Sequence, residues 1–121
     1  MLRKKTSVIL VGLHPELYFA MGIADRAFAD EGLECVITAG LDGLHNPGSL
    51  HPLGFALDFR NENCDDLQKA RIFEKLMRLQ RYGFDVVNEK AGQTAKTTAV
   101  HFHVEYQPKP NDHRVFWRLD D

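Results

Sequence analysis

The chain has 121 residues, of which 44% are hydrophobic and 26% are charged, with a formal net charge of -2. This length suits one compact domain and is short for two, so we predict a single domain over residues 1–121. The longest basic run is RKK at residues 3–5, which argues against a nucleic-acid partner, and no apolar run approaches the roughly 20 residues that cross a bilayer, which argues against membrane insertion.

The first half of the chain is expected to contain one helix and two strands. Apolar residues at helical spacing predict a helix over residues 15–31, with Pro15 suited to its first turn and Gly32 to its end. Residues 33–40, LECVITAG, are short and rich in β-branched side chains, which predicts a strand. A loop rich in Gly, Pro and Asn follows, and the alternation in FALDFR at residues 55–60 predicts the next strand.

The second half is expected to add one helix and two more strands. Apolar residues repeat at helical spacing up to Gly83, which predicts a helix within residues 65–82. Residues 84–89 and 99–106 are predicted strands, and residues 107–121 are a predicted loop with a short apolar anchor. This order of elements favours an α+β fold, with a small antiparallel sheet and two main helices.

Two short segments carry the residues of a possible metal site. SLHPLGFALDFR contains His51 and Asp58, and AVHFHVEY contains His101 and His103. Alternate side chains of a strand share one face, so the two histidines of the second segment project together, and the Pro-Leu-Gly turn could fold the first histidine back over Asp58. An isolated HxH is weak evidence, because strand histidines are more often surface or core residues. Catalytic zinc sites, however, use three protein ligands, and two histidines with one carboxylate form an established set.

The two segments together resemble a known family of zinc peptidases. SLHPLGFALD at residues 49–58 fits the SxHxxGxAxD signature of the zinc D-Ala-D-Ala carboxypeptidases and L-alanyl-D-glutamate endolysins. HFH at residues 101–103 fits the HxH motif of the wider group that includes lysostaphin-like and hedgehog-type domains. The resemblance covers residues 13–107, with VITAGLD in the place of an ITSGYR-like strand, and implies a hedgehog/D-Ala-D-Ala-peptidase-like fold.

The resemblance also implies a role for individual residues. It implies that His51, Asp58 and His103 bind Zn²⁺, and that His101 lies beside the metal as an acid/base or as a stabiliser of the transition state. A further set is expected to bind substrate or to support the ligands: Ser49, His45 and Arg60.

The first departure from the family concerns the general base. Many relatives carry Glu or Asp three residues before the final zinc ligand, but Val100 stands there in this chain. The role then falls to His101, since histidine commonly acts as a general acid or base, or to Glu89 or Glu105 from elsewhere in the sequence.

The second departure concerns an arginine. In relatives, the arginine of the ITSGYR-like segment helps to hold the substrate or the developing oxyanion, but the aligned residue here is Asp42. An acid cannot do this work. Another cation, such as Arg60 or Lys96, would have to substitute, or the substrate would have to differ.

The resemblance implies a zinc metallopeptidase that hydrolyses a peptide bond in the peptidoglycan stem peptide or cross-bridge, of the endolysin or D,D-carboxypeptidase type. We expect a monomeric phage or bacterial lytic enzyme. No secretory signal is recognisable, so we expect it in the cytoplasm before release to the cell wall, or associated with a virion. The departures leave two alternatives: a non-catalytic zinc-binding structural or virion-associated module of the same fold, and a metal-free binding domain.

Overall fold

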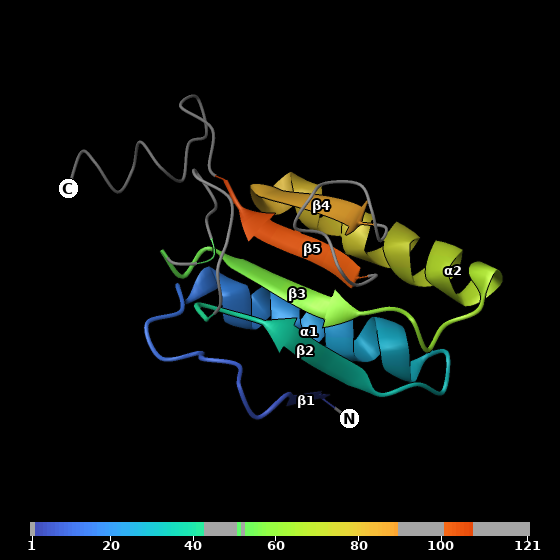
Figure 1. Cartoon of the computed structure of the whole chain (residues 1–121). Helices are drawn as coiled ribbons and strands as arrows, with labels where there is room; N and C mark the ends of the chain where they lie inside the picture. The colour runs from blue at the N-terminus through green and yellow to red at the C-terminus, as the bar shows by residue number, and fades with distance from the viewer. Residues whose placement is uncertain (1, 43–50, 52, 90–100, 108–121) are drawn as a thin grey trace.

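The fold is built on a five-stranded sheet with the strand order β1-β2-β3-β5-β4 (Figure 1). The computed structural model describes residues 2–42, 51, 53–89 and 101–107. The strands are β1 (Leu2–Lys4), β2 (Cys35–Ala39), β3 (Ala56–Arg60), β4 (Phe84–Glu89) and β5 (His101–Tyr106). β1 runs parallel to β2, whereas every other neighbouring pair is antiparallel. The sheet is therefore mixed, and the predicted antiparallel sheet is wrong at its β1 edge.

β1 is the strand that the sequence did not predict. It is only three residues long, and its Arg3 and Lys4 are exposed, so it shows no alternation of apolar and polar residues. It pairs with β2 through the backbone. The N–H of Lys5, just after β1, continues this pairing by donating to the carbonyl of Ile37 at 3.0 Å. Backbone pairing of this kind leaves little trace in the side-chain pattern.

The other strands agree with the predictions. β2 and β3 lie inside their predicted ranges, and β4 has the predicted bounds. The described part of the last predicted strand is β5. Residues 99 and 100, the loop over residues 43–50 and the predicted loop from residue 108 lie outside the described residues.

Two α-helices also lie where they were predicted. α1 spans Glu16–Ala29, and α2 spans Asp66–Met77 and continues as a 3-10 turn, η1, over Arg78–Tyr82. Asp65 begins α2 because its carboxylate accepts from the N–H of Gln68, whose side chain accepts in return from the N–H of Asp65. Gly83 ends the turn with a positive φ of 88°. Within the described ranges, no helix is long and apolar enough to span a membrane.

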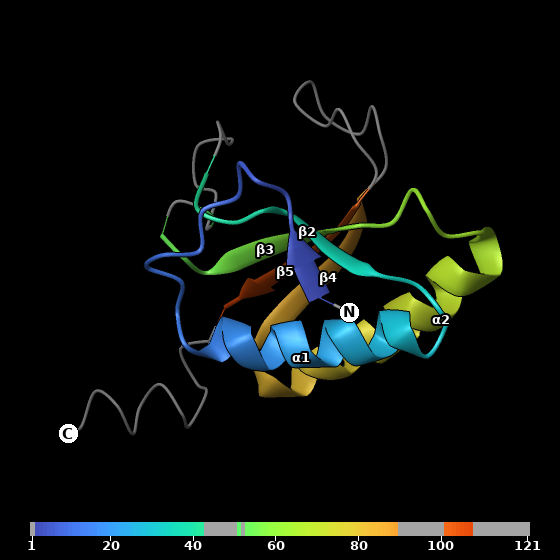
Figure 2. The same ribbon diagram turned by 90° about the horizontal axis from the view of Figure 1, so that it is seen from below.

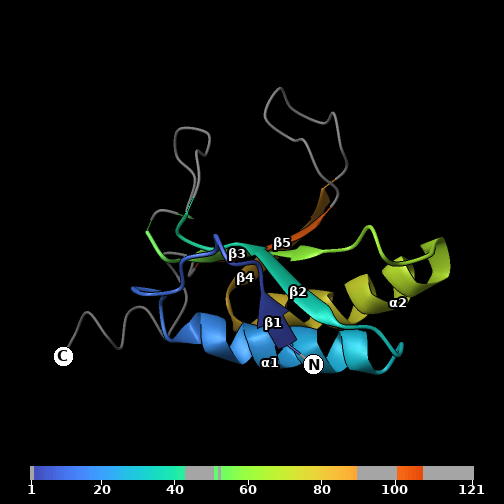
Figure 3. The same ribbon diagram turned by 60° about the horizontal axis from the view of Figure 1, so that its bottom comes forward.

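The core lies between the sheet and the two helices, which cover the same face of the sheet (Figures 2 and 3). The ring centre of Phe102 in β5 lies 6.1 Å from that of Phe28 in α1 and 6.0 Å from that of Phe73 in α2. Leu57 and Phe59 of β3 are completely buried on this side. Because side chains alternate along a strand, the residues between them project from the opposite face, which the helices leave open.

Candidate metal centre

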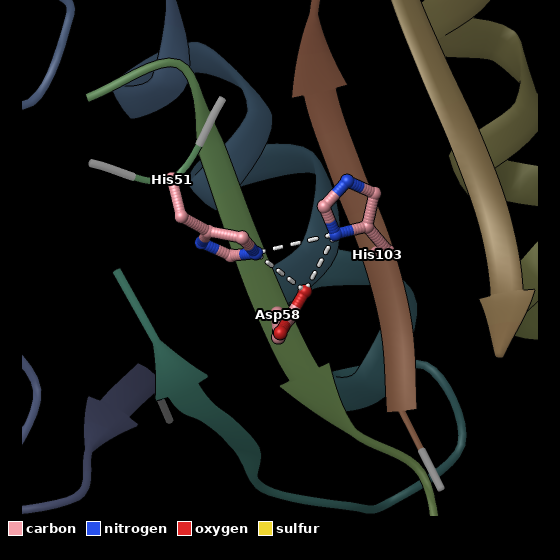
Figure 4. A group of neighbouring side chains, drawn as sticks. All are labelled: His51, Asp58 and His103. Atoms are coloured by element: carbon pink, nitrogen blue, oxygen red, sulfur yellow. Dashed lines mark hydrogen bonds and ion pairs between the residues drawn. The ribbon is translucent and has the colours of Figure 1, made fainter. Parts of the chain in front are cut away.

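Two histidines and one aspartate converge on the open face of the sheet (Figure 4). Asp58 of β3 and His103 of β5 are opposite each other in the antiparallel register, and His51 reaches them from the turn before β3. Nδ1 of His103 lies 2.8 Å from Oδ1 of Asp58 and 3.3 Å from Nε2 of His51, which is itself 3.2 Å from the same oxygen. The three ligand atoms lie within 4.8 Å of one another, so this ligand group (His51, Asp58 and His103) could hold a metal ion.

A tight turn places His51 over β3. Gly54 has a φ of +80°, and its N–H donates to the carbonyl of His51 at 3.0 Å. A Cβ atom at Gly54 would lie 2.3 Å from the carbonyl oxygen of Gly12, and the N–H of His14 donates to the carbonyl of Gly54 at 2.8 Å. The glycine of the SLHPLGFALD motif is thus required both by the turn and by the close approach of a second backbone segment.

The imidazole of His51 is oriented by the backbone behind it. Its Nδ1 lies 2.8 Å from the carbonyl oxygen of Gly40. A carbonyl only accepts hydrogen bonds, so Nδ1 carries the proton and Nε2 turns its lone pair toward Asp58 and His103. This is the tautomer that a metal ligand needs.

Asp42 supports this arrangement. Its Oδ1 accepts from the N–H of Gly40 and from the N–H of Ile9, each at 2.9 Å. Asp42 therefore holds the segment whose carbonyl orients His51. Sequence reasoning missed the role of the Gly40 carbonyl and that of the Asp42 carboxylate. The signal for them was an aspartate two residues after a glycine, a pattern typical of turns.

The ligand group is almost removed from solvent, with exposed fractions of 3% for His51, 7% for Asp58 and 9% for His103. Burial alone would raise the pKa of Asp58, but the hydrogen bond from His103 and the interactions with His51 and His101 outweigh burial and hold that pKa well below its usual range. Burial alone would lower the pKa of His103, but the hydrogen bond and charge of Asp58, followed by those of Glu105, raise it to about 9. Without a metal, the proton on His103 and the charge on Asp58 therefore stabilise each other.

A second pair, His101 and Glu89, lies beside the ligand group. The two residues are opposite each other in the register of β5 and β4, and Nε2 of His101 lies 3.0 Å from Oε2 of Glu89. The same nitrogen lies 3.4 Å from Oδ2 of Asp58, and Oε1 of Glu89 lies 3.9 Å from Nδ1 of His103. The neighbouring strand thus places the carboxylate of Glu89, one of the alternatives left open by the sequence, beside His101 and the ligand group.

The remaining predicted site residues are placed less fully. Arg60 lies two residues after Asp58 on the same strand face and opposite His101 in the register. Its guanidinium Nε lies 3.4 Å from Oε1 of Glu62, so its described ion pair is with a residue outside the ligand group. Three predicted residues lie outside the described residues: His45, Ser49 and Lys96.

Comparison of the chain with protein-family models, with curated proteins and with solved structures gave no significant match. The function is therefore inferred from the geometry of the site and from the two sequence motifs.

Proposed function

We propose that this chain is a zinc metallopeptidase that hydrolyses a peptide bond in the peptidoglycan stem peptide or cross-bridge. The observation that carries the proposal is the convergence of Nε2 of His51, Oδ1 of Asp58 and Nδ1 of His103 within 4.8 Å of one another. The three atoms come from β3, from the glycine-dependent turn just before it and from β5, in which His103 lies 45 residues after Asp58.

The donor set fits zinc. Catalytic zinc sites commonly have three nitrogen or oxygen ligands from the protein and a further open position, and two histidines with one carboxylate meet this requirement. The hydrogen bond from His51 to the carbonyl of Gly40 is the kind of outer support that zinc-binding histidines usually have. Bound zinc would polarise the scissile carbonyl and lower the pKa of a nearby water molecule.

The chain itself supplies a route for the proton. Hydrolysis forms a bond from a water oxygen to the carbonyl carbon, breaks the bond to the amide nitrogen and moves a proton to that nitrogen. Glu89 is a carboxylate that can accept the proton of the water, and His101, 3.0 Å away, can share it and support its delivery to the leaving amine. Both side chains are partly exposed, with 28% of Glu89 and 15% of His101 accessible to solvent, so a substrate on the open face can reach them.

The substrate class is taken from the resemblance of SLHPLGFALD and HFH to the zinc D-Ala-D-Ala carboxypeptidases and L-alanyl-D-glutamate endolysins. The alternative is a zinc-binding module of the same fold without turnover. It is favoured by Asp42, which occupies the position of the family's arginine and hydrogen-bonds the backbone at Gly40 and Ile9.

Incubation with purified peptidoglycan, followed by mass spectrometry of the released muropeptides, tests the proposal. We expect cleavage that a chelator abolishes and zinc restores. His51→Ala should lose both zinc and cleavage, because a ligand is removed, whereas Glu89→Gln should retain zinc and lose most of the cleavage. Glu74→Gln, which removes an exposed carboxylate on α2, is the matched control and should behave as wild type.

Two results would contradict the proposal in different ways. A zinc-loaded wild type that releases no muropeptide would favour the non-catalytic module. A wild type that binds no zinc, with the same metal content as His51→Ala, would favour the metal-free binding domain.

A further inference from the structure

The carboxylate of Glu105 connects the ligand group to the end of β5. Its Oε1 lies 2.6 Å from Nε2 of His103, and its Oε2 accepts from the side-chain amide of Gln107. The N–H of Gln107 in turn donates to the carbonyl of Gly83 at 2.7 Å. Glu105 is therefore held on both oxygens, with only 18% of its side chain exposed.

This contact determines which nitrogen of His103 faces the ligand group. An ionised carboxylate only accepts hydrogen bonds, so Nε2 of His103 carries a proton toward Glu105. The nitrogen left for a metal is then Nδ1, which lies 3.3 Å from Nε2 of His51 and would give up to the metal the proton that it donates to Oδ1 of Asp58 at 2.8 Å. Glu105 thus does for His103 what the carbonyl of Gly40 does for His51, and it adds a negative charge near the metal position.

We propose that Glu105 is a positioning residue of the metal centre, which holds His103 in the Nε2–H tautomer and so sets the affinity for the metal. The inference depends on the metal site of the proposed function and deepens it, because the family pattern assigns no role to this position. Carboxylate partners of metal-binding histidines typically change metal affinity by about 10- to 100-fold.

The test is zinc affinity, measured on the full chain by competition with a chromophoric chelator at one neutral pH. We expect Glu105→Ala to raise the Kd by about 10- to 100-fold, because the ring loses its partner. Glu105→Gln should raise it less, because the amide oxygen still accepts from Nε2 but carries no charge. Asp85→Asn is the matched control: Asp85 is opposite Glu105 in the register of β4 and β5, so the variant removes the same charge from the same face without touching His103.

A second measurement reads the tautomer itself. In nitrogen-15 NMR of the chelated protein, at a pH above about 9 where the imidazole of His103 is neutral, His103 of the wild type should carry its proton on Nε2. Glu105→Ala should shift the population toward Nδ1–H. Purely structural damage would lower thermal stability without moving this population.

Several outcomes would overturn the inference. It fails alone if wild type binds zinc and both Glu105 variants bind equally well, if Asp85→Asn loses as much affinity as Glu105→Ala, or if His103 of the wild type carries its proton on Nδ1. A wild type that binds no zinc overturns the proposed function, and the inference with it.

Discussion

In the chelated protein, raising the pH should remove the stabilisation that His103 provides. Burial alone would lower its pKa, but Asp58 and then Glu105 raise it from 6.5 to about 9. A group whose pKa is higher in the folded state contributes stability that is complete below its unfolded pKa and is lost as the pH rises through the folded value. The difference between 6.5 and about 9 corresponds to about 3 kcal/mol of unfolding free energy.

The assay is urea unfolding in the presence of a chelator, at a series of pH values from about 6 to about 10, which spans both pKa values. The quantity to follow is the unfolding free energy of wild type minus that of His103→Gln, because other groups that titrate in this range cancel in the difference. We expect this difference to fall by about 3 kcal/mol across the series. The control is His14→Gln, a histidine variant outside the ligand group. Its unfolding free energy minus that of His103→Gln should fall with pH as the wild-type difference does.

A difference between wild type and His103→Gln that stays constant from the lowest to the highest pH would refute the reasoning. It would mean that His103 is not held as a cation by Asp58 in the folded protein. Asp58→Asn gives an independent check, because it removes the main partner of the cation and should abolish most of the decline.

Two further predictions concern the metal and the turn. Zinc affinity should fall about tenfold for each pH unit below about 9, because binding must displace the proton of His103; competition titrations at several pH values measure this slope, and a pH-independent affinity would contradict it. Gly54→Ala should lower the unfolding free energy by more than about 2 kcal/mol and weaken zinc binding, because the added Cβ meets the carbonyl of Gly12 where φ is +80°. The control is Gly32→Ala, because φ is +72° there but an added Cβ would meet no atom within 4 Å. It should lower the unfolding free energy by about 1–2 kcal/mol, measured by urea unfolding, and leave the zinc affinity, measured by competition, unchanged. Equal effects of the two variants would contradict the steric argument.

The helices and most of the strands could be predicted because each of them follows a local rule. α1 and α2 repeat apolar residues at helical spacing, glycines lie shortly after α1 and after the 3-10 turn that continues α2, and β3 alternates apolar and polar residues from Leu57 to Arg60. β1 could not be predicted, since it is three residues long and its pairing with β2 is made by the backbone. The parallel edge of the sheet therefore has no local signal.

The residues of the ligand group were predicted from two motifs, but the groups that orient their side chains were not. His51, Asp58 and His103 come together as the resemblance implies. The group that orients His51 is the backbone carbonyl of Gly40, and every residue has such a carbonyl, so the sequence carries no signal for it. Glu89 was an open alternative, which the pairing of β4 with β5 brings to 3.0 Å from His101.

The sequence by itself determined the two α-helices and four of the five described strands, because hydrophobic periodicity and caps act over a few residues. It also determined which side chains of β3 and β5 share a face, because alternation along a strand is a property of the backbone. Only the tertiary structure decided the distances: the register of β3 with β5 sets Asp58 against His103, and the register of β4 with β5 sets Glu89 beside His101. Strand register depends on contacts between segments far apart in the chain, so the chemistry of this site was decided by the way in which the sheet is assembled.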